Sequence, residues 1–174
     1  MSADFDSLLT LIDEAIHINA DISSLQSVTG PAEVKTDRIP TLEPDCYRAI
    51  TPMLDVRFGL FSYWRNATHG DWLSVSEMKS LWSDTKDDYI QRIADNVKAA
   101  ADNWANDAYG LFLPKRLSLF AASPDILERI YLLWLDNADE PELLVYDCNG
   151  MARYKDLGEY LTAYINDDLS QYNN

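Results

Sequence analysis

The chain is poor in the residues that build metal centres and covalent cross-links. Among its 174 residues there are two cysteines, Cys46 and Cys148, and two histidines, His17 and His69. The cysteines lie far apart and form no metal-type spacing, so we expect two reduced thiols in a cytoplasmic protein. The sequence contains no HExxH motif, phosphate-binding loop, GxGxxG motif or G-x-S-x-G nucleophile motif. We therefore expect no metal, no cofactor and no enzymatic activity.

Basic residues are also scarce. The chain has 14 Lys and Arg against 29 Asp and Glu, which gives a formal net charge of −15. This balance disfavours binding to nucleic acid, because that affinity depends largely on neutralising phosphates. It also disfavours an anionic membrane surface. It favours association with a basic protein, which an acidic surface attracts by electrostatic steering. Solubility alone is an alternative explanation for the same charge.

Long hydrophobic runs are absent. No apolar stretch approaches the roughly 18 residues of a membrane-spanning helix. Met1–Asp6 lacks the positive charges of a secretion signal, and no long apolar core follows it. We expect no membrane association and a cytoplasmic location. With 47% hydrophobic and 25% charged residues, the composition is typical of a globular protein, and the length is enough for one domain core.

The last third of the chain has the clearest pattern. Ile130–Leu135 and Leu143–Tyr146 are strand-like apolar runs joined by an acidic turn. Asn149-Gly150 predicts a tight hairpin turn with positive φ at both residues. Asp156 with Glu159 resembles a capping box that opens a final helix. The apolar face of that helix is expected to consist of Leu157, Tyr160, Leu161, Tyr164 and Ile165.

The N-terminal part is less regular. A first helix is predicted, followed by an irregular segment over about 19–44 with at most one extended stretch. A helix over 45–55, limited by Pro52, and a strand over 56–64 are then expected. The apolar stripe of the first helix is Leu8, Leu9, Ile12, Ala15 and Ile16.

Two further helices are predicted in the middle of the chain. Ser74 and Glu77 form a capping-box pattern for a short helix that ends near Trp82. A helical insertion over about 86–107 follows, with Gly110 as a helix-ending glycine. The segment 111–120 is predicted to be extended. Together these elements predict one α+β domain over 1–174, with a mostly antiparallel sheet flanked by helices.

The pattern of the last third resembles the SUKH superfamily, whose members are widely found as bacterial immunity proteins that neutralise toxins. Ile130–Trp134, Glu140–Asp147 and Arg153–Ile165 match that family in residue type and order. A looser similarity covers Pro44–Arg48 and the region from Phe58 to Met78. The Asn-Gly-Gly-like turn of the family is missing between Arg48 and Leu60, and the insertion at 86–107 has no strict counterpart. The similarity covers about two-thirds of the chain.

Two acidic regions are candidate partner-binding sites. The first is the turn between the two strand-like runs; a solvated hairpin tip is the alternative, since its spacing does not fit a calcium loop. The second is the loop around His69, flanked by two tryptophans that could serve as interface anchors or as core residues. The candidate residues are Asp136, Asp139, Glu140 and Glu142 in the turn, and Trp64, His69, Asp71 and Trp72 around the loop.

The family resemblance implies a protein that works by binding. We expect it to occlude a cognate bacterial toxin that is basic at its contact surface; in this family the toxin is often a nuclease. A non-enzymatic regulatory or scaffolding protein of the same fold is the alternative, and an uncharacterised hydrolase is a more distant one. The oligomeric state is not indicated by the sequence.

Overall fold

The computed structural model describes residues 2–22, 26–33, 35–101 and 112–173. The helices within these ranges are α1 (Ser2–Ile22), α2 (Pro52–Leu60), α3 (Val75–Ser80), α4 (Asp88–Ala101) and α5 (Leu157–Ile165), with short 3-10 turns η2 (Pro114–Arg116) and η3 (Ser170–Asn173). The strands are β1 (Val28–Thr29), β2 (Arg38–Pro40), β3 (Tyr47–Ala49), β4 (Trp64–Arg65), β5 (Asp71–Trp72), β6 (Leu117–Ala122), β7 (Arg129–Leu133), β8 (Glu142–Asp147) and β9 (Gly150–Tyr154).

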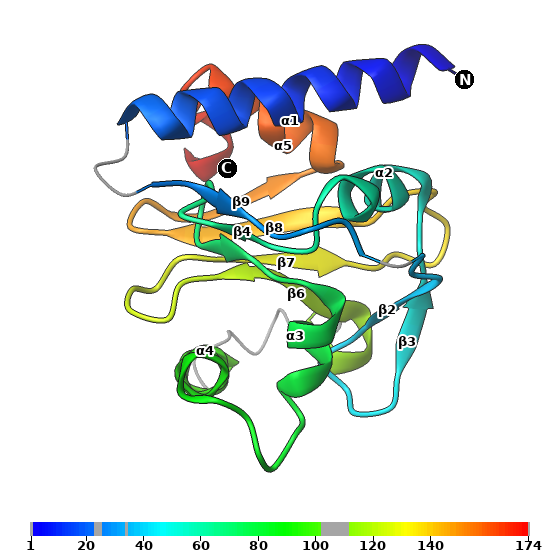
Figure 1. Ribbon diagram of the computed structural model, residues 1–174, viewed down its shortest axis with the longest axis vertical. Helices are drawn as coiled ribbons and strands as arrows, with labels where there is room; N and C mark the ends of the chain where they lie inside the picture. The colour runs from blue at the N-terminus through cyan, green and yellow to red at the C-terminus, as the bar shows by residue number, and fades with distance from the viewer. Residues whose placement is uncertain (1, 23–25, 34, 102–111, 174) are drawn as a thin grey trace.

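The fold is α+β, as predicted, with one large antiparallel sheet and one small one. Strand order in the large sheet is β1-β4-β5-β6-β7-β8-β9, while β2 and β3 pair separately. Figure 1 shows α1 and α5 on one face of the large sheet, and α3 and α4 on the other. Because helices cover both faces, every residue of β6 is buried, and all of them are apolar except Ser118, whose hydroxyl accepts the indole N–H of Trp134.

The predicted elements of the last third are confirmed. In the β7–β8 pair, Ile130 lies opposite Val145 and Leu132 opposite Leu143. Asp156 caps α5 by accepting the backbone N–H of Glu159, with an O···N distance of 2.9 Å. The apolar face of α5 is turned to the sheet: Leu157, Tyr160 and Leu161 are buried, and Tyr164 and Ile165 are partly buried.

The hairpin turn was predicted one residue too late. Asp147 pairs with Gly150 in the β8–β9 register, so the turn consists of Cys148 and Asn149. The Asp147 carboxylate accepts the backbone N–H of Asn149 at 2.7 Å, and this Asx-type bond closes the turn. Gly150 has a φ of 111° and begins β9, whereas Asn149 has a negative φ.

The segment from 45 to 65 was assigned wrongly. Residues 47–49 form β3, and the helix begins at Pro52 and continues through the expected strand to Leu60. Proline suits the first turn of a helix, because a backbone N–H at that position would have no hydrogen-bond partner within the helix. Leu54 and Phe58 then fall four residues apart and face the core. Only Trp64 and Arg65 remain extended, as β4.

Other boundaries also differ from the predictions. The irregular segment contains two short strands, β1 and β2, and α1 extends into it as far as Ile22. Leu9, expected in the buried stripe of α1, is exposed. The helical insertion is confirmed over Asp88–Ala101. The rest of the predicted insertion, up to residue 107, and the expectation for Gly110 lie outside the described residues.

A buried arginine joins α2 to the core beneath β5. Arg57 has no exposed surface, and its guanidinium donates hydrogen bonds to the carbonyl oxygens of Phe61 and Ser62 at 3.0 Å and of Leu73 at 3.1 Å. Its Cζ lies 3.9 Å from the centre of the Phe58 ring. Burial lowers the pKa of Arg57 to about 9. Carbonyl dipoles and an aromatic face therefore replace the water that a buried cation loses.

Candidate functional site

The two predicted acidic regions lie at opposite ends of the sheet. Successive strands from β4 to β9 are neighbours and antiparallel, so every second turn falls at the same end. The turns 66–70, 123–128 and 148–149 therefore meet at one end, which we call the loop end. The turn between β7 and β8 is at the other end, and the structure does not bring the two regions together.

Most carboxylates of the β7–β8 turn are occupied by contacts within the chain. Asp136 pairs with the guanidinium of Arg116 at 3.0 Å. Glu142 pairs with Arg153 on the adjacent strand. Asp139 is exposed to solvent. Arginines of the same chain thus already neutralise part of the negative charge at Asp136 and Glu142, so this turn offers less free charge to a partner than predicted.

Glu140 has a structural position that the sequence did not reveal. Its carboxylate accepts the backbone N–H of Met53 at 2.9 Å and the hydroxyl of Thr51, the residue before α2. Partial burial raises the pKa of Glu140, and these two hydrogen bonds oppose the rise. The side chain satisfies a donor at the beginning of α2 that has no partner within the helix. Its expected exposure to a partner is not observed.

Trp64 and Trp72 are core residues, which removes them from any surface site. Both have 0% exposure, and their ring centres lie 5.0 Å apart in an edge-to-face arrangement. The indole N–H of Trp72 donates to Thr68 Oγ1 at 2.9 Å, and that of Trp64 donates to Ser27. Each buried indole thus has a partner for its polar atom.

Asp71 also has a structural position. One carboxylate oxygen accepts the backbone N–H of Asn66 at 2.8 Å, and the other accepts the Tyr89 hydroxyl at 2.9 Å. Asn66 has a φ of 49°, and the first of these bonds holds it in the turn after β4. Asp71 therefore shapes the loop around His69 and is only partly exposed.

His69 is the predicted site residue that faces a cavity. Its Nε2 lies 3.1 Å from Asp147 Oδ2, and its Nδ1 lies 2.8 Å from the Tyr160 hydroxyl oxygen. The imidazole is 18% exposed. Burial lowers the pKa of His69, and the nearby Asp147 carboxylate raises it by a smaller amount. The ring is thus fixed at both nitrogens. His17, in contrast, is exposed on α1, with Nδ1 2.7 Å from the carbonyl oxygen of Asp13.

A chain of hydrogen bonds extends from His69 into the core. The Tyr160 hydroxyl lies 2.6 Å from Thr68 Oγ1, which also accepts the indole N–H of Trp72. On the outer side, the Tyr172 hydroxyl donates to Asp147 Oδ2 at 2.9 Å. The connected polar groups hold the β4–β5 loop, α5, the β8–β9 turn and η3 in one arrangement.

His69 and its neighbours Asp147, Tyr160 and Tyr172 line a cavity of about 430 Å³, which we call the His69 cleft. Among the described residues, its walls include three aspartates and no Lys or Arg. Asp167 and Asp168 directly follow α5, where the helix dipole is already negative. The principal walls are His69, Asp147, Tyr154, Tyr160, Tyr164, Asp167, Asp168 and Tyr172. Acidic groups and aromatic rings together form a suitable environment for a cation.

Exposed apolar side chains lie at the same end of the sheet. Leu127 is 70% exposed in the β6–β7 turn, and its neighbour Ile126 is exposed too. Glu128 connects this turn to the His69 loop by accepting the backbone N–H of Gly70 at 3.2 Å. Leu169, beside the cleft, is also exposed. The loop end thus combines negative charge with accessible apolar surface.

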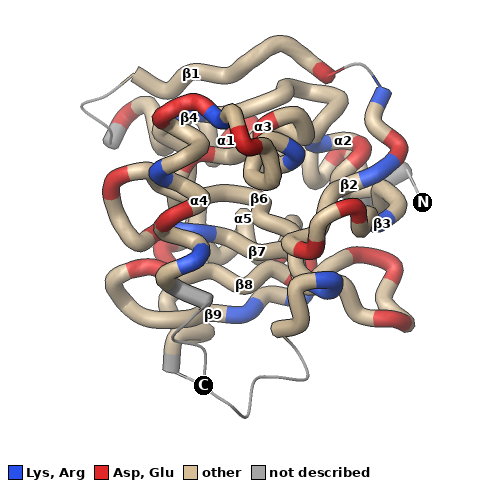
Figure 2. The backbone as a smooth tube through the Cα atoms, turned by 90° about the horizontal axis from the view of Figure 1, so that it is seen from below, with Lys and Arg blue, Asp and Glu red and all other residues tan. Residues whose placement is uncertain are grey.

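Sequence reasoning identified His69 but not the residues around it. Asp147 and Tyr172 lie far from His69 in the chain, and no local pattern links them. The run Asn166-Asp167-Asp168 after a helix was a usable signal, because acidic residues at a helix C-terminus are electrostatically unfavourable. Figure 2 shows acidic residues all around the backbone, so net charge alone does not locate this site.

The described residues offer no group of three or more His, Cys, Asp or Glu side chains that could hold a metal ion. Cys46 and Cys148 are free thiols, the first partly buried and the second exposed. No helix in the described part of the chain is long and apolar enough to cross a bilayer.

Comparisons with protein-family models, curated proteins and solved structures give no match to this chain. The SUKH resemblance therefore stays a prediction from the sequence.

Proposed function

We propose that this protein binds a basic protein toxin and blocks it stoichiometrically, as a cytoplasmic immunity protein of the SUKH type. The observation that carries the proposal is the loop end, where an aspartate-lined aromatic cleft with exposed Leu169 at its wall shares one end of the sheet with exposed Leu127. Interface anchors are typically large side chains in water-excluding surroundings, with charges that orient the partner.

In this mechanism a Lys or Arg side chain of the toxin enters the His69 cleft. Its cationic group meets the exposed carboxylates of Asp167 and Asp168 and lies against the tyrosine rings. Leu127 contacts apolar surface on the toxin and excludes water from the charged contacts. For a nuclease toxin, the carboxylates would occupy the positions of substrate phosphates and deny them to nucleic acid.

The geometry around His69 favours binding over hydrolysis. A catalytic histidine needs one ring nitrogen within hydrogen-bond reach of a nucleophile or of substrate. Both nitrogens of His69 face groups that are themselves buried: the Tyr160 hydroxyl and the Asp147 carboxylate, whose side chain is 5% exposed. The ring is placed to support the wall of the cleft.

A regulatory protein that binds an unrelated basic partner through the same surface is the alternative. The reading frame next to the gene distinguishes the two: a large multidomain toxin supports immunity, while a metabolic operon supports regulation. The direct test is expression of the adjacent toxin domain in a susceptible cell, with and without this protein. We expect growth only when both are present, and a stable complex on size-exclusion chromatography.

Matched variants connect that protection to the loop end. Asp168→Lys should weaken protection, while Asp139→Lys, the same charge change at the opposite end of the sheet, should not. Leu127→Ala should weaken protection, while Leu60→Ala, an exposed leucine on α2, should not. Protection without a complex, or equal loss from both members of a pair, would contradict the proposed surface.

A further inference from the structure

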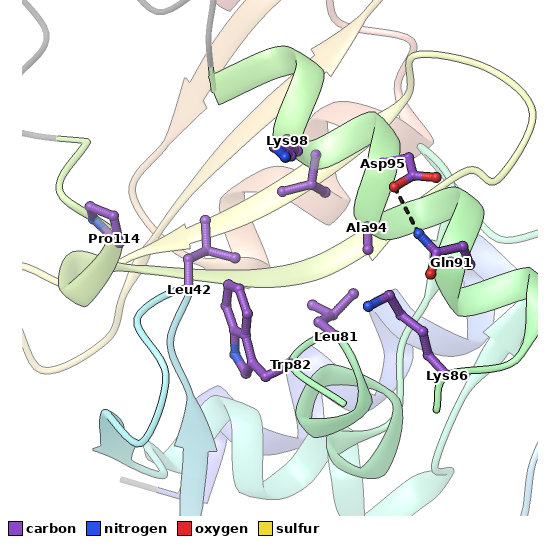
Figure 3. A pocket seen from close by; sticks show the side chains of 10 residues that line it. Leu42, Leu81, Trp82, Lys86, Gln91, Ala94, Asp95, Lys98 and Pro114 are labelled. Carbon is purple, nitrogen blue, oxygen red and sulfur yellow. Dashed lines mark hydrogen bonds between the residues drawn. The ribbon is translucent and has the colours of Figure 1, made fainter. Parts of the chain in front are cut away.

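A second cavity, of about 480 Å³, lies on the face of the sheet opposite α1 and α5. Figure 3 shows it between the end of α3, one side of α4, and the segments that carry Leu42 and Pro114. Among the residues that the structure describes, it shares none with the His69 cleft. Its lining residues are Leu42, Leu81, Trp82, Lys86, Gln91, Ala94, Asp95, Val97, Lys98 and Pro114.

The walls of this cavity are mainly apolar and held in place. Trp82 is 43% exposed, which is high for the largest apolar side chain. Its indole N–H donates to the Thr41 carbonyl oxygen at 3.4 Å, so the ring has a fixed orientation. Leu42 and Leu81 are buried, and Ala94 and Val97 of α4 face the space from the other side.

Two lysines give the cavity a charge opposite to that of the whole protein. Lys86 extends toward α4 and donates to the Ser83 carbonyl oxygen at 3.1 Å, and Lys98 lies further along α4. Within the described part of the chain, neither ammonium group forms an ion pair. One oxygen of Asp95, the single acidic residue among the described lining residues, accepts the Gln91 amide at 2.8 Å. Unpaired cations beside an apolar hollow complement an anion with an apolar body.

We propose that this cavity binds a small apolar carboxylate, such as a medium-chain fatty acid. The apolar chain lies against Trp82, Leu81 and Val97, and the carboxylate pairs with Lys86 and Lys98. The volume is within the range of about 300–1,000 Å³ that small-molecule sites occupy. The ligand site is independent of the toxin-binding proposal, because it uses a different surface.

The test is a titration of the full chain with decanoate, followed by two-dimensional ¹H–¹⁵N NMR. We expect the indole N–H signal of Trp82, assigned from a Trp82→Phe variant, to shift with saturation. Decanol has the same chain without the charge and should bind more weakly. The double substitution of Lys86 and Lys98 by Gln should weaken decanoate binding about three- to tenfold, as expected for two partly exposed ion pairs, and leave decanol binding unchanged.

Two controls keep the result specific. Lys115→Gln with Lys155→Gln makes the same change in net charge at two exposed lysines that do not line the cavity, and decanoate affinity should stay within twofold. Ala94→Trp fills the cavity, so it should abolish the shift with both ligands while the remaining spectrum stays native. The proposal is overturned if decanoate at millimolar concentration leaves Trp82 unshifted, or if decanol and decanoate bind equally.

Discussion

The imidazole Nε2 of His69 lies 3.1 Å from Oδ2 of Asp147, and this contact joins the β4–β5 loop to the β8–β9 turn. The same carboxylate oxygen accepts the Tyr172 hydroxyl, so the C-terminal 3-10 turn is tied to the pair. Because both groups line the His69 cleft, the protonation of His69 alters the charge of the surface that we assign to partner binding.

The pKa values of the two histidines should lie on opposite sides of the ordinary histidine value of about 6.5. Burial lowers the pKa of His69, whereas the hydrogen bond to the Asp13 carbonyl and the Asp13 carboxylate raise the pKa of His17. A ¹H NMR titration of the ring Cε1–H signals, assigned with single His→Gln variants, checks both. Equal pKa values would contradict the buried placement of His69.

The pH dependence of stability follows from the sign of the His69 shift. Since the folded pKa is lower than the unfolded one, the unfolded chain binds more protons between the two values. The contribution of His69 to stability is therefore complete above about pH 6.5 and decreases as the pH falls through the folded pKa. Urea unfolding at pH 7.5 and 5.5 should show a larger loss for wild type than for His69→Gln. An equal loss in both would contradict the prediction.

Glu140 and its neighbour Asp139 form a matched pair for testing the cap of α2. Glu140→Ala removes the acceptor for the Met53 N–H and the Thr51 hydroxyl, and should lower the free energy of unfolding by about 1–2 kcal/mol. Asp139→Ala, at an exposed position, should change it by less than about 0.5 kcal/mol. Chemical denaturation at pH 7 measures both. A similar small effect from each would mean that Glu140 is not a cap.

The sequence predicts the elements whose patterns are local. The apolar stripe of α5, the β7 and β8 runs and the Ser74–Glu77 capping box each depend on residues a few positions apart, and the structure confirms them. The helix at Pro52 was misplaced because Pro52 was interpreted as a helix limit, whereas it lies in the first turn. Its acidic cap, Glu140, comes from a distant turn, which no local pattern indicates.

The candidate site was only partly predictable for a related reason. Trp64, Trp72 and Asp71 flank a loop in the sequence and were therefore candidates for a surface site. In the structure, Phe120 of β6 packs against Trp72, and the Tyr89 hydroxyl binds Asp71. Both partners are distant in the chain, so the local sequence does not reveal these contacts. The carboxylates of Asp136 and Glu142 appeared free in the sequence because their Arg partners come from other segments. His69 was correctly selected, while its partners Asp147 and Tyr160 required the three-dimensional arrangement.

Truncation of Leu161 tests the packing of α5 on the sheet. Leu161 has no exposed surface, so Leu161→Ala should lower the free energy of unfolding by about 2–5 kcal/mol, the range for a buried leucine. Thr162→Ala on the outer side of α5 should cost less than about 1 kcal/mol. Urea denaturation of both variants provides the measurement. A cost below 1 kcal/mol for Leu161→Ala would contradict the observed burial.

Association kinetics with the cognate toxin separate the two contributions proposed for the loop end. Charges at the rim act chiefly on the association rate, so Asp168→Lys should slow association and reduce its dependence on salt. An apolar anchor acts chiefly on the dissociation rate. Leu127→Ala should therefore leave the association rate unchanged and raise the dissociation rate. The increase is about thirtyfold if Leu127 is a hot spot that contributes about 2 kcal/mol.

The measurement is surface plasmon resonance at 50 and 300 mM salt, with Asp139→Lys and Leu60→Ala as matched controls for charge and for apolar area. Thermal unfolding of each variant excludes loss of fold as the cause. If Asp139→Lys slows association as much as Asp168→Lys, the effect comes from net charge and not from the His69 cleft. If Leu127→Ala dissociates at the wild-type rate, the β6–β7 turn lies outside the interface, and the binding surface must be sought elsewhere on the protein.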